Sequence, residues 1–71
     1  MTLRDFNCLS EVGKDEAVSF KGTLLKEQLI PGYKVILYQV DNFYVEAYYD
    51  SREEKLKRYK GCTRSDILYN G

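Results

Sequence analysis

A chain of 71 residues with eleven basic and eleven acidic side chains is read as one small domain, residues 1–71, and its neutral charge argues against a dedicated nucleic-acid-binding protein. A domain of this size buries about 60% of the surface that its unfolded chain exposes, so its core is thin. Apolar residues make up 44% of the sequence and charged residues 31%, which is typical of a folded protein and excludes a disordered one.

The sequence has no features of a membrane or secreted protein. No apolar run approaches the roughly 20 residues of a membrane-spanning helix. The opening residues, Met-Thr-Leu-Arg-Asp, lack the basic region and apolar run of a signal peptide. The expected location is therefore the cytoplasm.

Metal and cofactor sites are not expected. Histidine is absent, and the two cysteines, Cys8 and Cys62, are not spaced as metal ligands. A cytosolic protein rarely contains a structural disulfide. We therefore expect two free thiols, both buried or half-buried, with no metal, no cofactor and no required disulfide.

The N-terminal part predicts two short helices. Over residues 2–11 apolar side chains recur every three positions, and Thr2 followed by Asp5 is a helix-capping signal. A second helix over residues 14–21 begins with acidic residues, ends with a lysine and is closed by Gly22. The side chains expected to face inward are Leu3, Phe6, Leu9, Ala17, Val18 and Phe20.

Residues 23–30 precede Pro31-Gly32, a pair typical of a type II turn. This turn twists the wrong way for a tight two-residue hairpin, so we expect a longer loop with a shifted register. The region after it, residues 34–50, contains two runs of β-branched and aromatic side chains around Asp41-Asn42. Both turn residues tolerate a left-handed backbone, which predicts a two-residue hairpin turn.

That turn fixes the register and so divides the hairpin into two faces. One face is apolar and is the expected core face, with the pairs Val40–Phe43, Tyr38–Val45, Ile36–Ala47 and Lys34–Tyr49. The other face is mixed and aromatic, with the pairs Gln39–Tyr44, Leu37–Glu46, Val35–Tyr48 and Tyr33–Asp50. We expect the mixed face to be partly exposed.

Residues 51–62 have two interpretations of equal weight. Ser51-Arg52-Glu53-Glu54 matches a capping box and Gly61 could end a helix. The same residues also read as a turn from Asp50 to Glu54 followed by a lysine-rich edge strand, since lysines protect sheet edges from mispairing. A short C-terminal helical turn is expected over residues 65–69.

The expected fold is therefore α+β, with two short N-terminal helices packed on an antiparallel meander of three or four strands. The order of Phe6…Leu9, Gly-Thr-Leu-Leu at 22–25, the hairpin Leu-Tyr…Phe-Tyr-Val-Glu and Asp-Ile-Leu-Tyr at 66–69 resembles that of a group of small bacterial proteins of similar length without an assigned function. The resemblance implies a strand over residues 55–62, with Cys62 in the place of an aromatic residue, and it implies no catalytic residues.

Catalysis is not expected. Without histidine, a serine or cysteine nucleophile lacks its usual base. The carboxylate pairs Asp15-Glu16 and Glu53-Glu54 lie in charged, solvated stretches. Glu46 stands between tyrosines and could be desolvated, although a cross-strand lysine is the more ordinary environment for it. No glycine-rich phosphate loop is present.

Two binding functions remain. Seven tyrosines exceed what a thin core accommodates, and tyrosine is favoured in protein interfaces. We therefore expect a non-catalytic protein-interaction module, most simply a self-associating one, that uses the mixed face: Tyr33, Val35, Leu37, Tyr44 and Tyr48. The rival interpretation is that the helices or the C-terminal segment cover this face.

The alternative function is weak binding of single-stranded nucleic acid. Residues 51–71 carry six basic and three acidic side chains, against five and eight in residues 1–50. Cations interleaved with an aromatic ring attract phosphates and stack on bases. The candidate residues are Lys55, Lys57, Arg58, Tyr59, Lys60 and Arg64, with Tyr44 and Tyr48 beside them. No small-molecule substrate and no membrane are inferred.

Overall fold

The computed structural model describes residues 1–64, which form two helices and a four-stranded antiparallel sheet. The helices are α1 (Leu3–Asn7) and α2 (Glu11–Lys21), and the strands are β1 (Gly22–Ile30), β2 (Tyr33–Val40), β3 (Phe43–Asp50) and β4 (Leu56–Cys62). The strands follow one another as a meander in the order β1-β2-β3-β4. The α+β class is confirmed, while the turn expected over 65–69 lies outside the described residues.

Local signals explain where the helices begin. The Thr2 hydroxyl accepts a hydrogen bond from the Asp5 N–H at 3.1 Å, and the Asp5 carboxylate accepts one from the Thr2 N–H, as the capping box predicts. α2 begins three residues earlier than expected because the Ser10 hydroxyl caps it through the Gly13 N–H. The expectation that Phe20, in the last turn of α2, faces inward was wrong, since this side chain is 84% exposed.

The central hairpin has the predicted register at every position, from Val40 opposite Phe43 to Tyr33 opposite Asp50. Asp41 adopts the left-handed backbone, with φ of 51°, and Asn42 does not. The expected loop after β1 was wrong: Ile30 pairs directly with Tyr33 across a tight turn in which Gly32 has φ of 83°. The irregularity lies instead in β1, where a bulge at Leu25 shifts the register and adds local twist.

Residues 56–62 form a strand, which resolves the choice between helix and strand. Asp50 explains the turn before it, because its carboxylate accepts the N–H groups of Arg52 and Glu53, both at 2.8 Å. Gly61 lies under α1, where a Cβ atom would come within 2.5 Å of the Leu3 Cδ1. This glycine therefore permits the close approach of α1 to β4 and does not end a helix.

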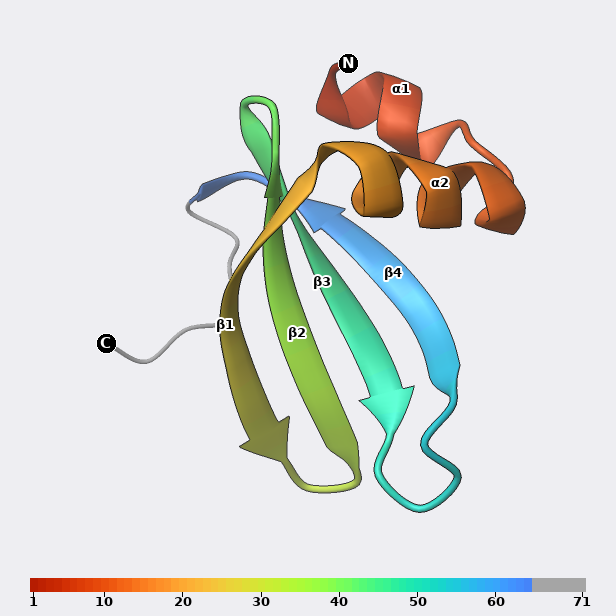
Figure 1. Ribbon diagram of the computed structural model, residues 1–71, viewed down its shortest axis with the longest axis vertical. Helices are drawn as coiled ribbons and strands as arrows, with labels where there is room; N and C mark the ends of the chain where they lie inside the picture. Colours follow the sequence, from red (N-terminus) through yellow and green to blue (C-terminus); the bar gives the residue numbers. More distant parts are fainter. Residues whose placement is uncertain (65–71) are drawn as a thin grey trace.

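Both helices lie over one end of the sheet, so they cover only part of its helix-side face (Figure 1). Beneath them the core is dry, and its fully or nearly fully buried side chains are Phe6, Ala17, Val18, Val40, Phe43 and Val45. Leu3, Leu9, Tyr38 and Tyr59 pack around this cluster. The predicted core face of the hairpin is therefore confirmed at the helix end, whereas Ile36 beyond the helices is only half-buried.

Candidate functional site

The mixed face of the hairpin is less exposed than the sequence suggested. Val35 and Tyr48 are buried, with 5% and 7% of their surface exposed, so the expectation that they form an open patch was wrong. Leu37 and Tyr44 are half-buried, and only Tyr33 among the five candidates is exposed. The face therefore does not present the continuous aromatic surface that we expected.

Tyr48 shows why this face is closed. The Tyr33 ring meets it edge-on with centroids 6.0 Å apart, and the Arg58 guanidinium lies 4.6 Å above it. The Tyr48 hydroxyl donates a hydrogen bond to the buried carboxylate of Glu46 at 3.1 Å. Burial, followed by the Glu46 charge, raises the pKa of Tyr48. Tyr48 is thus held by a neighbouring ring, a guanidinium group and a buried carboxylate of its own chain.

The nucleic-acid candidates are divided between the two faces of β4. Arg58 and Lys60 stand opposite Tyr48 and Glu46 in the register, on the mixed face. Tyr59 points to the helix side, where its hydroxyl donates to the Asp15 carboxylate. Lys57 pairs with Glu53 at 2.7 Å. Lys55 and Arg64 are exposed. The basic side chains and the aromatic ring interleaved with them therefore do not form one platform.

The cysteines are free, and they differ in environment. Cys62 is buried in β4, as expected, but Cys8 is exposed just beyond α1, which corrects the expectation that both thiols would be at least half-buried. Within residues 1–64 no group of three or more potential metal-ligating side chains comes together.

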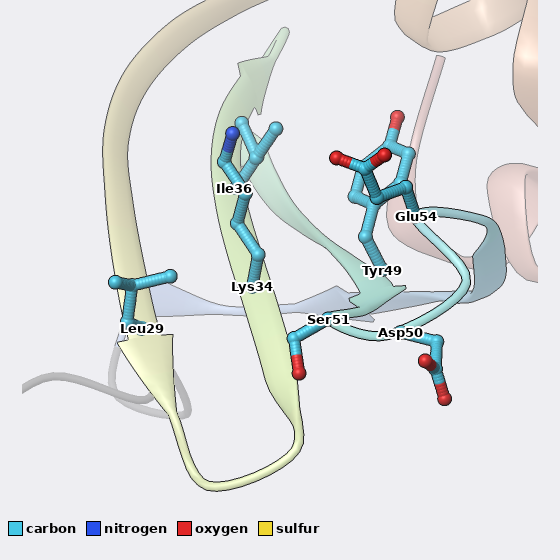
Figure 2. Close-up of a pocket in the computed structure, with 7 residues that line it drawn as sticks. All are labelled: Leu29, Lys34, Ile36, Tyr49, Asp50, Ser51 and Glu54. Carbon is cyan, nitrogen blue, oxygen red and sulfur yellow. The ribbon is translucent and has the colours of Figure 1, made fainter.

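The open half of the helix-side face contains a hollow of about 270 Å³. Figure 2 shows its lining, which comes from three strands and from the connection after β3: Leu29, Lys34, Ile36, Tyr49, Asp50, Ser51 and Glu54. Leu29, Ile36 and the Tyr49 ring supply apolar surface, and the polar groups stand around it. This combination of apolar walls and polar groups at their edge is typical of a binding site.

Lys34 is the cation of the hollow, and it is already paired. Its Nζ lies 3.0 Å from the Glu27 carboxylate on β1, in an exposed ion pair that adds little to stability. The hydrogen bond and charge of Glu27, with a further contribution from Glu54, raise the pKa of Lys34. The field at the Lys34 ammonium group is therefore dominated by carboxylates.

The connection between β3 and β4 holds Glu54 in place. The Asp50 N–H donates to the Lys55 carbonyl and the Glu54 N–H donates to the Asp50 carbonyl, both at 2.8 Å. Glu54 itself has φ of 56°, a left-handed conformation that is uncommon for a residue other than glycine. The two N–H groups that cap Asp50 lower the pKa of its carboxyl group. The loop backbone is thus fixed by hydrogen bonds at the edge of the hollow.

The sequence interpretation missed Leu29, Tyr49 and Glu54 as a site, and placed Ile36 in the core. A signal was available in the lengths of the elements. A helix that lies across the strands, as α2 does in Figure 1, covers a width of about 10–12 Å, whereas a strand of eight residues spans about 26 Å. A helix that packs at one end of such a strand leaves the other end uncovered.

Comparisons of the chain with protein-family models, with curated proteins and with solved structures gave no significant match. No helix in residues 1–64 is long and apolar enough to cross a membrane. The function must therefore be argued from the surface itself.

Proposed function

We propose that this domain is a non-catalytic protein-interaction module whose partner docks on the open half of the helix-side face. The observation that carries the proposal is the exposure of large apolar side chains along β1, from Leu24 (53% exposed), which adjoins the covered core, to Leu29 (78% exposed) at the open end. The register places Leu24 beside Tyr38 and Glu27 beside Ile36, so half-buried apolar side chains continue the surface inward. Exposed apolar side chains that surround a single ion pair, here that of Glu27 with Lys34, are typical of an interaction surface.

The polar groups of this region support binding more than catalysis. Lys34 is engaged by Glu27, and the Asp50 carboxylate caps the turn after β3. Protein interfaces usually have an apolar and aromatic centre surrounded by a polar rim. A partner bound to this surface would also stabilise the folded domain, whose small core contributes little stability on its own.

The test compares matched serine substitutions of exposed apolar residues. Leu24→Ser/Leu29→Ser removes side chains of the proposed surface, and Val12→Ser removes one from α2, where Val12 is also exposed. Sedimentation of each variant measures self-association, and capture with quantitative mass spectrometry measures hetero-partners. We expect the double variant to lose at least about tenfold in association and Val12→Ser to behave as the wild type. Equal association by all three proteins would contradict the proposal.

A further inference from the structure

The hollow on the open half of the helix-side face has a shape that indicates what enters it. Its volume of about 270 Å³ lies just below the roughly 300–1,000 Å³ of small-molecule pockets, and it suits one long side chain of a partner. Ile36 and Leu29 offer apolar contact to an aliphatic stem, and the Tyr49 ring offers an aromatic surface. An anchor residue in such a pocket supplies much of the energy of an interface.

The charges of the hollow select the sign of that side chain. Its lining contains one cation, Lys34, and two carboxylates, Asp50 and Glu54. Lys34 forms its ion pair with Glu27, which lies outside the lining. The Asp50 carboxylate already accepts hydrogen bonds from two N–H groups of the turn. Among residues 1–64, Glu54 is the lining carboxylate with neither a side-chain hydrogen bond nor an ion pair. The hollow therefore presents, beside apolar walls, a carboxylate that interacts with Lys34 only through its charge and has its hydrogen-bonding oxygens open.

The arrangement of Glu54 favours a planar cation. Glu54 and Tyr49 line the same hollow, and Figure 2 shows the Glu54 side chain extending from the β3–β4 connection on the side of the hollow that Tyr49 occupies. A guanidinium group can stack on an aromatic ring and donate two hydrogen bonds to a carboxylate, whereas an ammonium group acts as a point charge. The chain uses the same pairing on its other face, where Arg58 lies over Tyr48.

We propose that the hollow binds an arginine side chain of the protein partner. The inference rests on the proposed interaction function and specifies its anchor. The aliphatic part of the arginine lies on Ile36 and Leu29, and its guanidinium group stacks on Tyr49 and donates to the Glu54 carboxylate. The fixed backbone of Glu54 reduces the entropy lost when this contact forms.

The test uses three pentapeptides with blocked termini, Gly-Ser-Xaa-Ser-Gly, in which Xaa is arginine, lysine or citrulline. Citrulline has nearly the shape of arginine and carries no charge. Each peptide is titrated into the ¹⁵N- and ¹³C-labelled domain, and the signals of Ile36, Tyr49 and Glu54 are followed. We expect the arginine peptide to shift these signals at the lowest concentration, lysine next and citrulline last.

Two glutamate variants give the matched control. Glu54→Gln should lower the affinity for the arginine peptide about tenfold, because a charge-assisted hydrogen bond is lost. The affinity for the citrulline peptide should not change. Glu53→Gln removes a neighbouring carboxylate that is already paired with Lys57. This variant should bind both peptides with the affinity of the wild type. Equal affinity for arginine and citrulline, or no effect of Glu54→Gln, would overturn the arginine proposal.

The outcome separates this inference from the proposed function. If the peptides show no preference for arginine while Leu24→Ser/Leu29→Ser still loses its partner, the interaction surface stands and the anchor is wrong. If the double variant keeps its partner, the proposed function itself fails.

Discussion

The two ends of the helix-side face are built by the same strands and yet differ in their exposure to solvent. At the helix end Val45 and Phe6 are completely buried, and at the other end Ile36 is half-buried and Leu29 is largely exposed. The helix-side pattern stays largely apolar toward the open end, where Ile36 and Tyr49 lie beside the charged Lys34 and Glu27, so side-chain alternation alone does not explain the difference. It follows from the position and length of the helices (Figure 1). One end contains the buried core, and the other leaves apolar side chains in contact with solvent.

The largest expected difference between the two ends is the response to a buried charge. Val45→Asp would place an unpaired carboxylate in the dry core and should cost about 4 kcal/mol or more, enough to unfold a small domain. Leu29→Asp, the same kind of change at the open end, should cost about 1 kcal/mol or less. Circular dichroism with urea denaturation measures both. Comparable losses would show that the two ends do not differ as described.

The opposite face provides the next test, because Tyr48 belongs energetically with the covered end. Tyr48→Ser should cost about 3 kcal/mol, since it removes a buried ring together with its contacts to Arg58 and Glu46. Tyr33→Ser, which alters the more exposed partner of the same ring pair, should cost about 1 kcal/mol. The urea midpoints of the two variants measure these losses, provided that the free energy of unfolding depends equally steeply on urea concentration in both. A Tyr48→Ser protein as stable as the wild type would restore the open aromatic face that the sequence suggested.

A smaller effect is expected where α1 meets β4. Gly61→Val places atoms against Leu3 and against the completely buried Phe6 ring, which lies 3.3 Å from the point that a Cβ atom at residue 61 would occupy. Overpacking of this kind costs about 1–3 kcal/mol. The variant should unfold at lower urea concentration, and its Phe6 and Leu3 signals should shift in NMR spectra. An unchanged midpoint would mean that α1 moves away from the sheet without loss.

The smallest effect concerns high pH. Burial, as the largest cause, raises the pKa values of Tyr38, Tyr48 and Tyr59 in the folded chain, and Asp15 adds to the shift of Tyr59. The folded state therefore holds these protons more tightly than the unfolded state, whose tyrosine pKa is about 10. Their stabilisation is complete below about pH 10 and is lost as the pH rises through the raised values.

The urea midpoint should accordingly fall above about pH 10, and Tyr59→Phe should make the fall shallower because it removes one of the three groups. Denaturation curves at several pH values between about 8 and 11 provide the measurement. The same slope in the variant and in the wild type would exclude Tyr59 as a contributor.

Parts of this fold were readable from local signals. Asp41-Asn42 gave the register of the hairpin, and Thr2 with Asp5 gave the start of α1, because both depend on neighbours in sequence. The tight turn at Pro31-Gly32 was not predicted, and the register irregularity lies instead in a bulge several residues earlier, which no turn signal marks. The contact of Tyr48 with Arg58 could not be predicted while residues 51–62 had two interpretations.

The candidate site was harder to predict than the fold. Ile36 and Tyr49 lie on the face that the sequence correctly identified as apolar, but their availability depends on where the helices end in space. Glu54 sits in a charged stretch that looked like solvated surface, and its place beside Tyr49 follows from the hydrogen bonds around Asp50. Information of this kind is tertiary and is not contained in periodicity.

The packing of α1 on β4 also has a consequence for biosynthesis. Each strand pairs with its neighbour in sequence, so the three hairpins are local and form without long loop closure. Phe6, in contrast, meets Tyr59 near the other end of the described chain, with ring centroids 6.4 Å apart. During translation the first helix must therefore wait until β4 has left the ribosome before its side of the core is closed. Before then Phe6 has its contact with Phe43 on β3, at a ring-centroid distance of 5.6 Å, but lacks its contact with Tyr59, so the side of the core beneath α1 is completed last.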